Sequence, residues 1–157
     1  MRLADFIFKT LADLNYKDVF MITGGGGIHL FDAVSREPRL NYFCNHHEQA
    51  SSMVAEAYAR VKNEMSILCV TTGPGGINAL NGVFGAWTDS IPMLIISGQV
   101  KNQTYIRNYD VPGLRQLGDQ ETDIISMVKG ITKYAETVTD PKTIKYHLGK
   151  ALYLANS

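Results

Sequence analysis

The chain has 157 residues, of which 45% are hydrophobic and 19% charged, and this balance suits one domain with a buried core. Its formal net charge is zero, so neither a nucleic-acid partner nor a polybasic membrane patch is predicted. No apolar stretch approaches a membrane span, and acidic Asp5 stands where a signal peptide would be apolar. We expect a cytoplasmic protein whose two cysteines, Cys44 and Cys69, are reduced thiols in its core.

Periodic apolar residues divide the first two thirds of the chain into alternating helices and strands. In chain order these are a helix over residues 3–14, a strand over 19–22, a helix over 29–35, a strand over 40–44, a helix over 48–62, a strand over 66–71, a helix over 76–89 and a strand over 93–97. Continuous apolar strands separated by helices are typical of a parallel sheet covered on both faces. We therefore predict an α/β fold, a doubly wound parallel sheet with helices on both faces.

The last third of the chain departs from this alternation. Residues 98–121 show little periodicity, and a connection of that length inside a compact domain is usually a functional loop. After it we expect a short helix over 123–129, a fifth parallel strand over 132–138, and a final helix that starts at Asp140 with proline in its first turn. Because that helix still runs at Ser157 with no strand after it, we expect a domain that ends before its last strand.

Two glycine-rich turns follow strands of the predicted sheet. Gly24 to Gly27 form either a tight turn between strand and helix or a place where the backbone approaches a ligand closely. They are not a dinucleotide fingerprint, because the third glycine of that motif would fall on His29. In the second turn, Gly73 to Gly76, the position of that third glycine is occupied by Asn78. Neither turn ends in the Gly-Lys-Ser/Thr sequence of a P-loop. A generic nucleotide-binding domain is therefore disfavoured.

Glu48 begins a predicted helix directly after a strand. Open α/β sheets build ligand sites at the carboxyl ends of neighbouring strands, so we expect Glu48, Gly25 and Pro74 to converge there. His46 and His47 are adjacent and cannot face one metal from one helix, so no metal site is expected. A lone carboxylate at this edge suits proton handling for a bound cofactor. The alternative is an ordinary acidic residue that the helix dipole stabilises.

Several motifs, taken in order, resemble one family. They are His47 to Ala50, Glu56 to Arg60, Thr71 to Asn78, Asp89 to Met93, Ser97 to Val100, Gln120 to Ile124 and Ile131 to Tyr134. Over nearly the whole chain they are similar to the N-terminal pyrimidine-binding domain of acetolactate synthase-like thiamine diphosphate enzymes. The resemblance implies the thiamine diphosphate-binding fold, with one such domain over residues 1–157 and without the later central and diphosphate-binding domains.

The resemblance also implies roles for individual residues. The carboxylate that matches Glu48 bonds the N1′ nitrogen of the pyrimidine ring, and proton sharing there activates the C2 carbon of the cofactor. His29 is either a polar residue at a helix start or a substrate-side group. The remaining implied residues are the cofactor-binding Gly24, Gly25, Pro74 and Asn78 and the catalytic Gln120.

The implied reaction is decarboxylation of a 2-keto acid with carboligation, and the implied cofactors are thiamine diphosphate and Mg²⁺. In such enzymes the metal is bound through a Gly-Asp-Gly motif in a later domain, which this chain lacks. The diphosphate-binding domain of the same or a partner chain would complete the site in a homodimer or homotetramer, and the chain alone is expected to be inactive. The sequence differs from acetolactate synthases at Thr23, His29, His46 and Asp119, so the resemblance does not determine which substrates are used.

Two alternatives share the fold: an enzyme of sugar or surface-polysaccharide metabolism, and a non-catalytic binding or assembly domain. In either case the helices over residues 48–62 and 76–89 carry small and aromatic residues that resemble the family's dimer face, so we expect self-association. These residues are Ala50, Ala57, Tyr58, Phe84, Ala86 and Trp87.

Overall fold

One sheet of four parallel strands organises the computed structural model, which describes all residues from 1 to 157. In space the strands follow the order β2-β1-β3-β4. Their bounds are Asp18–Met21 for β1, Asn41–Cys44 for β2, Ser66–Val70 for β3 and Met93–Ser97 for β4. Because β1 pairs with both β2 and β3, the chain winds outward in two directions from the middle of the sheet. The predicted doubly wound parallel fold is confirmed.

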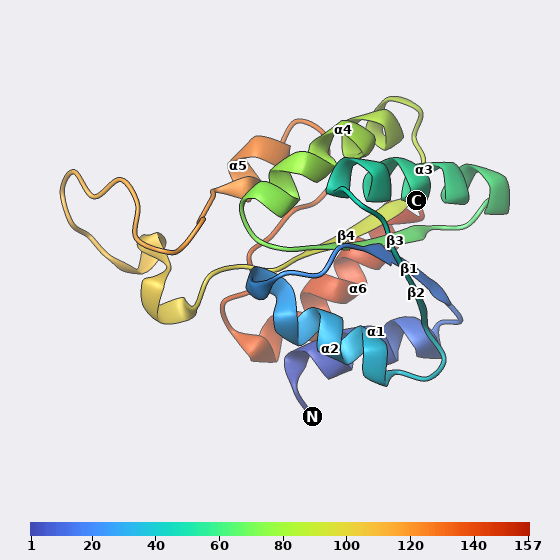
Figure 1. Cartoon of the computed structure of the whole chain (residues 1–157), viewed down its shortest axis with the longest axis horizontal. Helices are drawn as coiled ribbons and strands as arrows, with labels where there is room; N and C mark the ends of the chain where they lie inside the picture. The colour runs from blue at the N-terminus through green and yellow to red at the C-terminus, as the bar shows by residue number, and fades with distance from the viewer.

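Helices cover both faces of this sheet, as Figure 1 shows. The first layer holds α1 (Leu3–Asp13), α2 (Ile28–Arg36) and α6 (Ile144–Ala155), and the second holds α3 (Glu48–Lys62), α4 (Pro74–Thr88) and the short α5 (Ile124–Val128). Four single 3₁₀ turns lie in the connections, at Gly25–Gly27, Asn102–Thr104, Ile106–Asn108 and Pro141–Thr143. None of the helices has the length and apolar character that crossing a bilayer requires.

Alternate side chains of the strands enter two separate cores, because successive residues of a strand point to opposite faces. Val19 and Ile67 pack with α1 and α2 in the larger core. Phe20 and Leu68 face the other way, into a smaller core with α3 and α4. The larger core is rich in bulky aliphatic and aromatic residues, whereas the helices contribute mainly alanine to the smaller one. The α3 and α4 layer therefore lies close to the sheet.

The predicted fifth strand, over residues 132–138, is wrong. This segment runs from α5 to α6 without regular structure, and residues 132–139 make no backbone hydrogen bond. A pattern of β-branched and aromatic residues becomes a strand only where a neighbouring strand supplies ladder partners. β4 pairs only with β3, and the segment does not join the free edge of β4.

The prediction of two core cysteines is half right. Cys69 lies in β3, between two other strands, and is fully buried. Cys44 is exposed, because its strand β2 is at the edge of the sheet and all four of its residues are exposed. An apolar strand sequence does not distinguish an edge strand from a central one.

Not all residues of the expected dimer face lie on the surface. Ala86 is buried in the interior, so it cannot belong to a surface. Tyr58 is half buried, with its ring against Phe20 and its hydroxyl donating to Asp18 Oδ2 over 2.7 Å. Burial, together with that hydrogen bond to a carboxylate, raises the pKa of Tyr58 to about 12. Phe84 and Trp87 are exposed, as the prediction requires.

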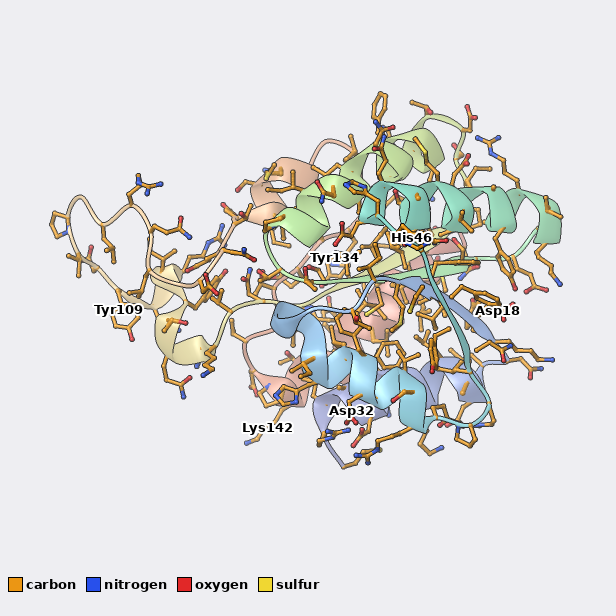
Figure 2. All side chains as sticks on the ribbon, viewed as in Figure 1. Asp18, Asp32, His46, Tyr109, Tyr134 and Lys142 are labelled. Atoms are coloured by element: carbon orange, nitrogen blue, oxygen red, sulfur yellow. The ribbon has the colours of Figure 1, made fainter.

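The connection from residue 98 to residue 121 projects from the body of the molecule (Figure 1). Tyr109 lies far out on this arm in Figure 2, and it is exposed. The arm leaves the carboxyl end of β4 and returns to the Pro74 turn at Gln120. Both ends of the functional loop expected from the sequence therefore lie at the carboxyl edge of the sheet.

Candidate functional site

The carboxyl ends of three neighbouring strands bring the main candidate residues to one edge. Glu48 is the first residue of α3, after β2, and Pro74 is the first residue of α4, after β3. Gly25 opens the 3₁₀ turn that follows β1, which lies between those two strands. The structure thus places Glu48, Gly25 and Pro74 at the same edge of the sheet, where the order of strands and helices predicts a ligand site.

His47 fixes the start of α3. It is the N-cap residue, with extended backbone angles, and its Nδ1 accepts the backbone N–H of Gln49 at 3.1 Å. This bond satisfies one of the free donors at the helix start. The preceding residue, His46, is exposed. No group of three histidine, cysteine or acidic side chains in the chain could hold a metal ion.

The carboxylate of Glu48 faces the first turns of α4. Its Oε2 accepts a hydrogen bond from Asn78 Nδ2 at 3.1 Å, and the contact is partly buried. Its Oε1 lies 3.4 Å from the position that a Cβ on Gly75 would occupy. That Cβ would also meet Thr71 Oγ1 at 2.3 Å, so only glycine lets the end of β3 and Glu48 approach α4 this closely.

Gln120 reaches the same turn from the arm. Its backbone oxygen lies 2.0 Å from where a Cβ on Gly73 would be, and Gly73 itself has a φ of +56°. Gln120 has a φ of 55°, in the left-handed region that non-glycine residues rarely adopt. Its side chain is exposed. The arm therefore holds Gln120 against the residue that precedes Pro74.

Two further side chains, Gln99 and Glu121, anchor the arm, and neither was predicted from the sequence to have a role. Gln99 Oε1 accepts from Thr72 Oγ1 at 2.9 Å and from the Val100 N–H at 2.8 Å. Glu121 is buried, and its carboxylate accepts the backbone N–H groups of Ile106 and Gly118. Gln99 and Glu121 lie within the family motifs, but Thr72 and Ile106 are 27 and 15 residues away from them, so only the structure could identify these two contacts.

The remaining candidates lie around the turn after β1. Gly24 packs against Thr71, whose Cγ2 is 2.6 Å from where a Cβ on Gly24 would be. Gly25 has open space at its own Cβ position. His29 is exposed in the first turn of α2, and its side chain makes no hydrogen bond with Glu48 or Asn78. The structure therefore does not join His29 to the Glu48 cluster.

The two oxygens of the Glu48 carboxylate have different surroundings. One is held by Asn78, and the other has no hydrogen-bond partner and lies near the buried Gly75. Two surface hollows, of about 150 Å³ at the base of the arm and about 280 Å³ beside Asp18 and Tyr58, are not lined by Glu48. The Glu48 cluster thus offers a partly buried carboxylate with one unpaired oxygen, which is able to form hydrogen bonds and exchange protons.

Comparison with known proteins identifies a matching family. Residues 1–127 match the family model described as thiamine pyrophosphate enzyme, N-terminal TPP binding domain. The matched part contains all four strands and every candidate site residue.

Individual relatives are similar over almost the whole chain. The chain is 32% identical over 154 residues to the acetolactate synthase isozyme 3 large subunit of Escherichia coli (strain K12), covering 98% of this chain and 25% of the relative. It is 31% identical over 157 residues to acetolactate synthase 1, chloroplastic, of Oryza sativa subsp. japonica, covering 98% of this chain and 22% of the relative. The chain therefore spans about a quarter of the length of the curated relatives that it matches.

Proposed function

The chain belongs to the thiamine pyrophosphate enzymes, as their N-terminal TPP binding domain, and from that membership we propose that it is the pyrimidine-binding half-site of an enzyme acting on 2-keto acids. The reaction is decarboxylation with carboligation, as in acetolactate synthase. The observation that carries the proposal is the single partly buried carboxylate of Glu48, placed at the carboxyl edge of the sheet with one oxygen free.

Each residue at the edge has one task in this proposal. Glu48 binds the N1′ nitrogen of the pyrimidine ring and exchanges a proton with it through the free oxygen. Gly25 leaves the backbone of its turn open to the ring, since nothing lies within 4 Å of its Cβ position. Pro74 borders the ring at the start of α4, and Gln120 lies where the arm meets the site. Thiamine diphosphate, when bound, supplies the carbon that attacks the 2-keto acid and the electron sink for decarboxylation. His29 remains a substrate-side candidate on a neighbouring turn.

The other half of the site comes from a diphosphate-binding domain, of the same or a partner chain, which also binds Mg²⁺. One finding supports this division: the chain covers about a quarter of the length of its relatives. On this proposal the chain is one domain of a longer enzyme, its sheet gains a further strand there, and residues 1–157 alone are inactive.

Substitution of Glu48 by glutamine tests the proposal in the enzyme assembled with its diphosphate-binding domain. Glutamine keeps the size and a hydrogen bond but cannot exchange a proton with the ring. Turnover of a 2-keto acid should fall about 10²-fold to 10⁴-fold, the usual contribution of one positioned proton-transfer group. Thiamine diphosphate affinity, measured by calorimetry, should change little.

Glu56→Gln on the same helix is the matched control, because Glu56 pairs with Arg60 away from the carboxyl edge. Its turnover should equal that of the wild type. Wild-type turnover in the Glu48→Gln variant would refute a catalytic role for Glu48 and leave a binding or assembly domain as the better account.

A further inference from the structure

The amide of Asn78 is directed at Glu48. Asn78 lies one turn into α4, and its Nδ2 donates to Glu48 Oε2 at 3.1 Å. This is the only side-chain hydrogen bond that the Glu48 carboxylate makes, and no lysine, arginine or histidine forms an ion pair with it. Asn78 is therefore the single protein group that holds the orientation of this carboxylate.

The hydrogen bond makes the two oxygens of Glu48 unequal. Oε2 is occupied by an N–H donor, so it is a poor place for a proton while the bond lasts. Oε1 lies 3.4 Å from the position that a Cβ on Gly75 would occupy, and no side-chain or backbone donor forms a hydrogen bond with it. A proton that enters or leaves the carboxyl group would therefore do so at Oε1.

We propose that Asn78 is a positioning residue that holds Glu48 through Oε2 and thereby makes Oε1 the oxygen that exchanges a proton with the cofactor ring. The proposal rests on the proposed function, since it takes the pyrimidine nitrogen as the proton partner of Glu48. It differs from the role that the family resemblance implies for Asn78, which is direct contact with the cofactor.

An amide suits this task better than a cation would. A lysine or arginine at this place would hold Glu48 in its ionised state through a fixed positive charge. Asn78 is neutral, and its Nδ2 can donate to Oε2 both in the carboxylate and in the carboxylic acid, where a proton on Oε1 leaves Oε2 as the carbonyl oxygen. Asn78 can therefore hold Glu48 before and after the proton moves.

The first test observes the hydrogen bond itself in the 157-residue chain, without cofactor. The side-chain NH₂ signals of Asn78 are followed by ¹H–¹⁵N NMR in the wild type and in the Glu48→Ala variant. The bonded proton of Asn78 should shift upfield by several tenths of a ppm when its acceptor is removed, as is general for a lost charge-assisted bond. Asn81, exposed on the same helix without a side-chain bond, should not change. An unchanged Asn78 signal in a folded Glu48→Ala variant would overturn the proposal.

The second test separates positioning from cofactor contact in the assembled enzyme. Asn78→Ala and Asn78→Asp should slow exchange of the cofactor C2 proton by about 10-fold to 100-fold, the effect of one hydrogen bond to a charged group. Thiamine diphosphate affinity should stay within about threefold, because Asn78 acts through Glu48. The Asn81→Ala variant should match the wild type in both the exchange rate and the cofactor affinity.

The pH profile supplies a readout that a structural defect would not move. On lowering the pH from about 8 to about 5, the carboxyl group in Asn78→Asp regains an O–H donor, so its exchange rate relative to wild type should recover. Asn78→Ala has no such group and should not recover.

The outcomes distinguish this inference from the function on which it rests. Lost cofactor affinity with a normal exchange rate in both Asn78 variants would make Asn78 a cofactor contact and overturn the inference alone. Wild-type exchange in Glu48→Gln would instead overturn the proposed function.

Discussion

A glutamate in the first turn of a helix is common, because the helix dipole stabilises it. Two contacts distinguish Glu48 from that ordinary case. One oxygen is held by Asn78, from the helix that follows the next strand along the chain, and the other lies beside Gly75. At the scale of the residue, the position of the Glu48 carboxylate depends on the amide donor of Asn78 and on the absence of a side chain at Gly75.

The two cysteines should differ strongly in reactivity. Burial raises the pKa of the Cys69 thiol well above its ordinary value, so at pH 8 it is protonated and inaccessible. Cys44 is exposed on the edge strand. Titration of the folded chain with Ellman's reagent should modify one thiol quickly, and the second only after guanidinium is added. The Cys44→Ser variant should show no fast thiol, and a fast reaction there would contradict the packing of β3.

At the scale of the element, the close packing of α3 against α4 brings Glu48 and Asn78 together. The helices approach at Gly82, where an added Cβ would lie 2.4 Å from Ser52 Oγ and 2.6 Å from its backbone carbonyl carbon. Ser52 is fully buried, so it has no room to move. The distance between Glu48 and α4 therefore depends on a glycine about one turn along α4 from Asn78.

Gly82→Ala should destabilise the chain by about 1–3 kcal/mol, because overpacking of a close helix contact forces the backbone to move. Gly85→Ala is the matched control on the same helix, since its Cβ would meet nothing within 4 Å. That substitution should stabilise the chain by about 0.4–1 kcal/mol through the unfolded state. Urea unfolding followed by circular dichroism measures both. Equal effects from the two substitutions would contradict the helix packing described here.

Local patterns predicted the elements well, and long-range contacts less well. Apolar runs and glycine turns located all four strands and placed Glu48 and Pro74 at one edge. Residues 132–138 have a strand-like pattern too, but whether they form a strand depends on a hydrogen-bonding partner that pattern does not reveal. The same limit applies to Cys44, whose exposure follows from the position of β2 in the sheet. Asn78 was assigned to the site by resemblance, whereas its bond to Glu48 required the fold.

At the scale of the whole molecule, one face remains uncovered. The outer surfaces of α3 and α4 expose large apolar side chains that soluble monomers usually bury. Among them, the exposed fraction is 54% for Phe84, 44% for Met53 and 43% for Trp87. This face lies on the same helices as Glu48 and Asn78, so a partner that covers it would also lie close to the site.

The chain should self-associate through this face, with the homodimer as the smallest assembly. Phe84→Asp should weaken association at least about tenfold, because it places a charge in an apolar contact. Tyr153→Asp is the control, since Tyr153 is more exposed but lies on α6, in the opposite layer. Sedimentation equilibrium of the three proteins measures the effect. A wild-type chain that stays monomeric at high concentration would contradict the expectation.

Exchange of the C2 proton of bound thiamine diphosphate tests the central claim, that Glu48 exchanges a proton with the pyrimidine ring, most directly. The rate is followed by NMR in samples transferred to deuterium oxide and quenched with acid, for the assembled wild-type enzyme and its Glu48→Gln variant. The account predicts an exchange rate lower by about 10²-fold to 10⁴-fold in the variant, with the cofactor still bound. Exchange at the wild-type rate would contradict it and would leave Glu48 as an acidic residue at the start of a helix.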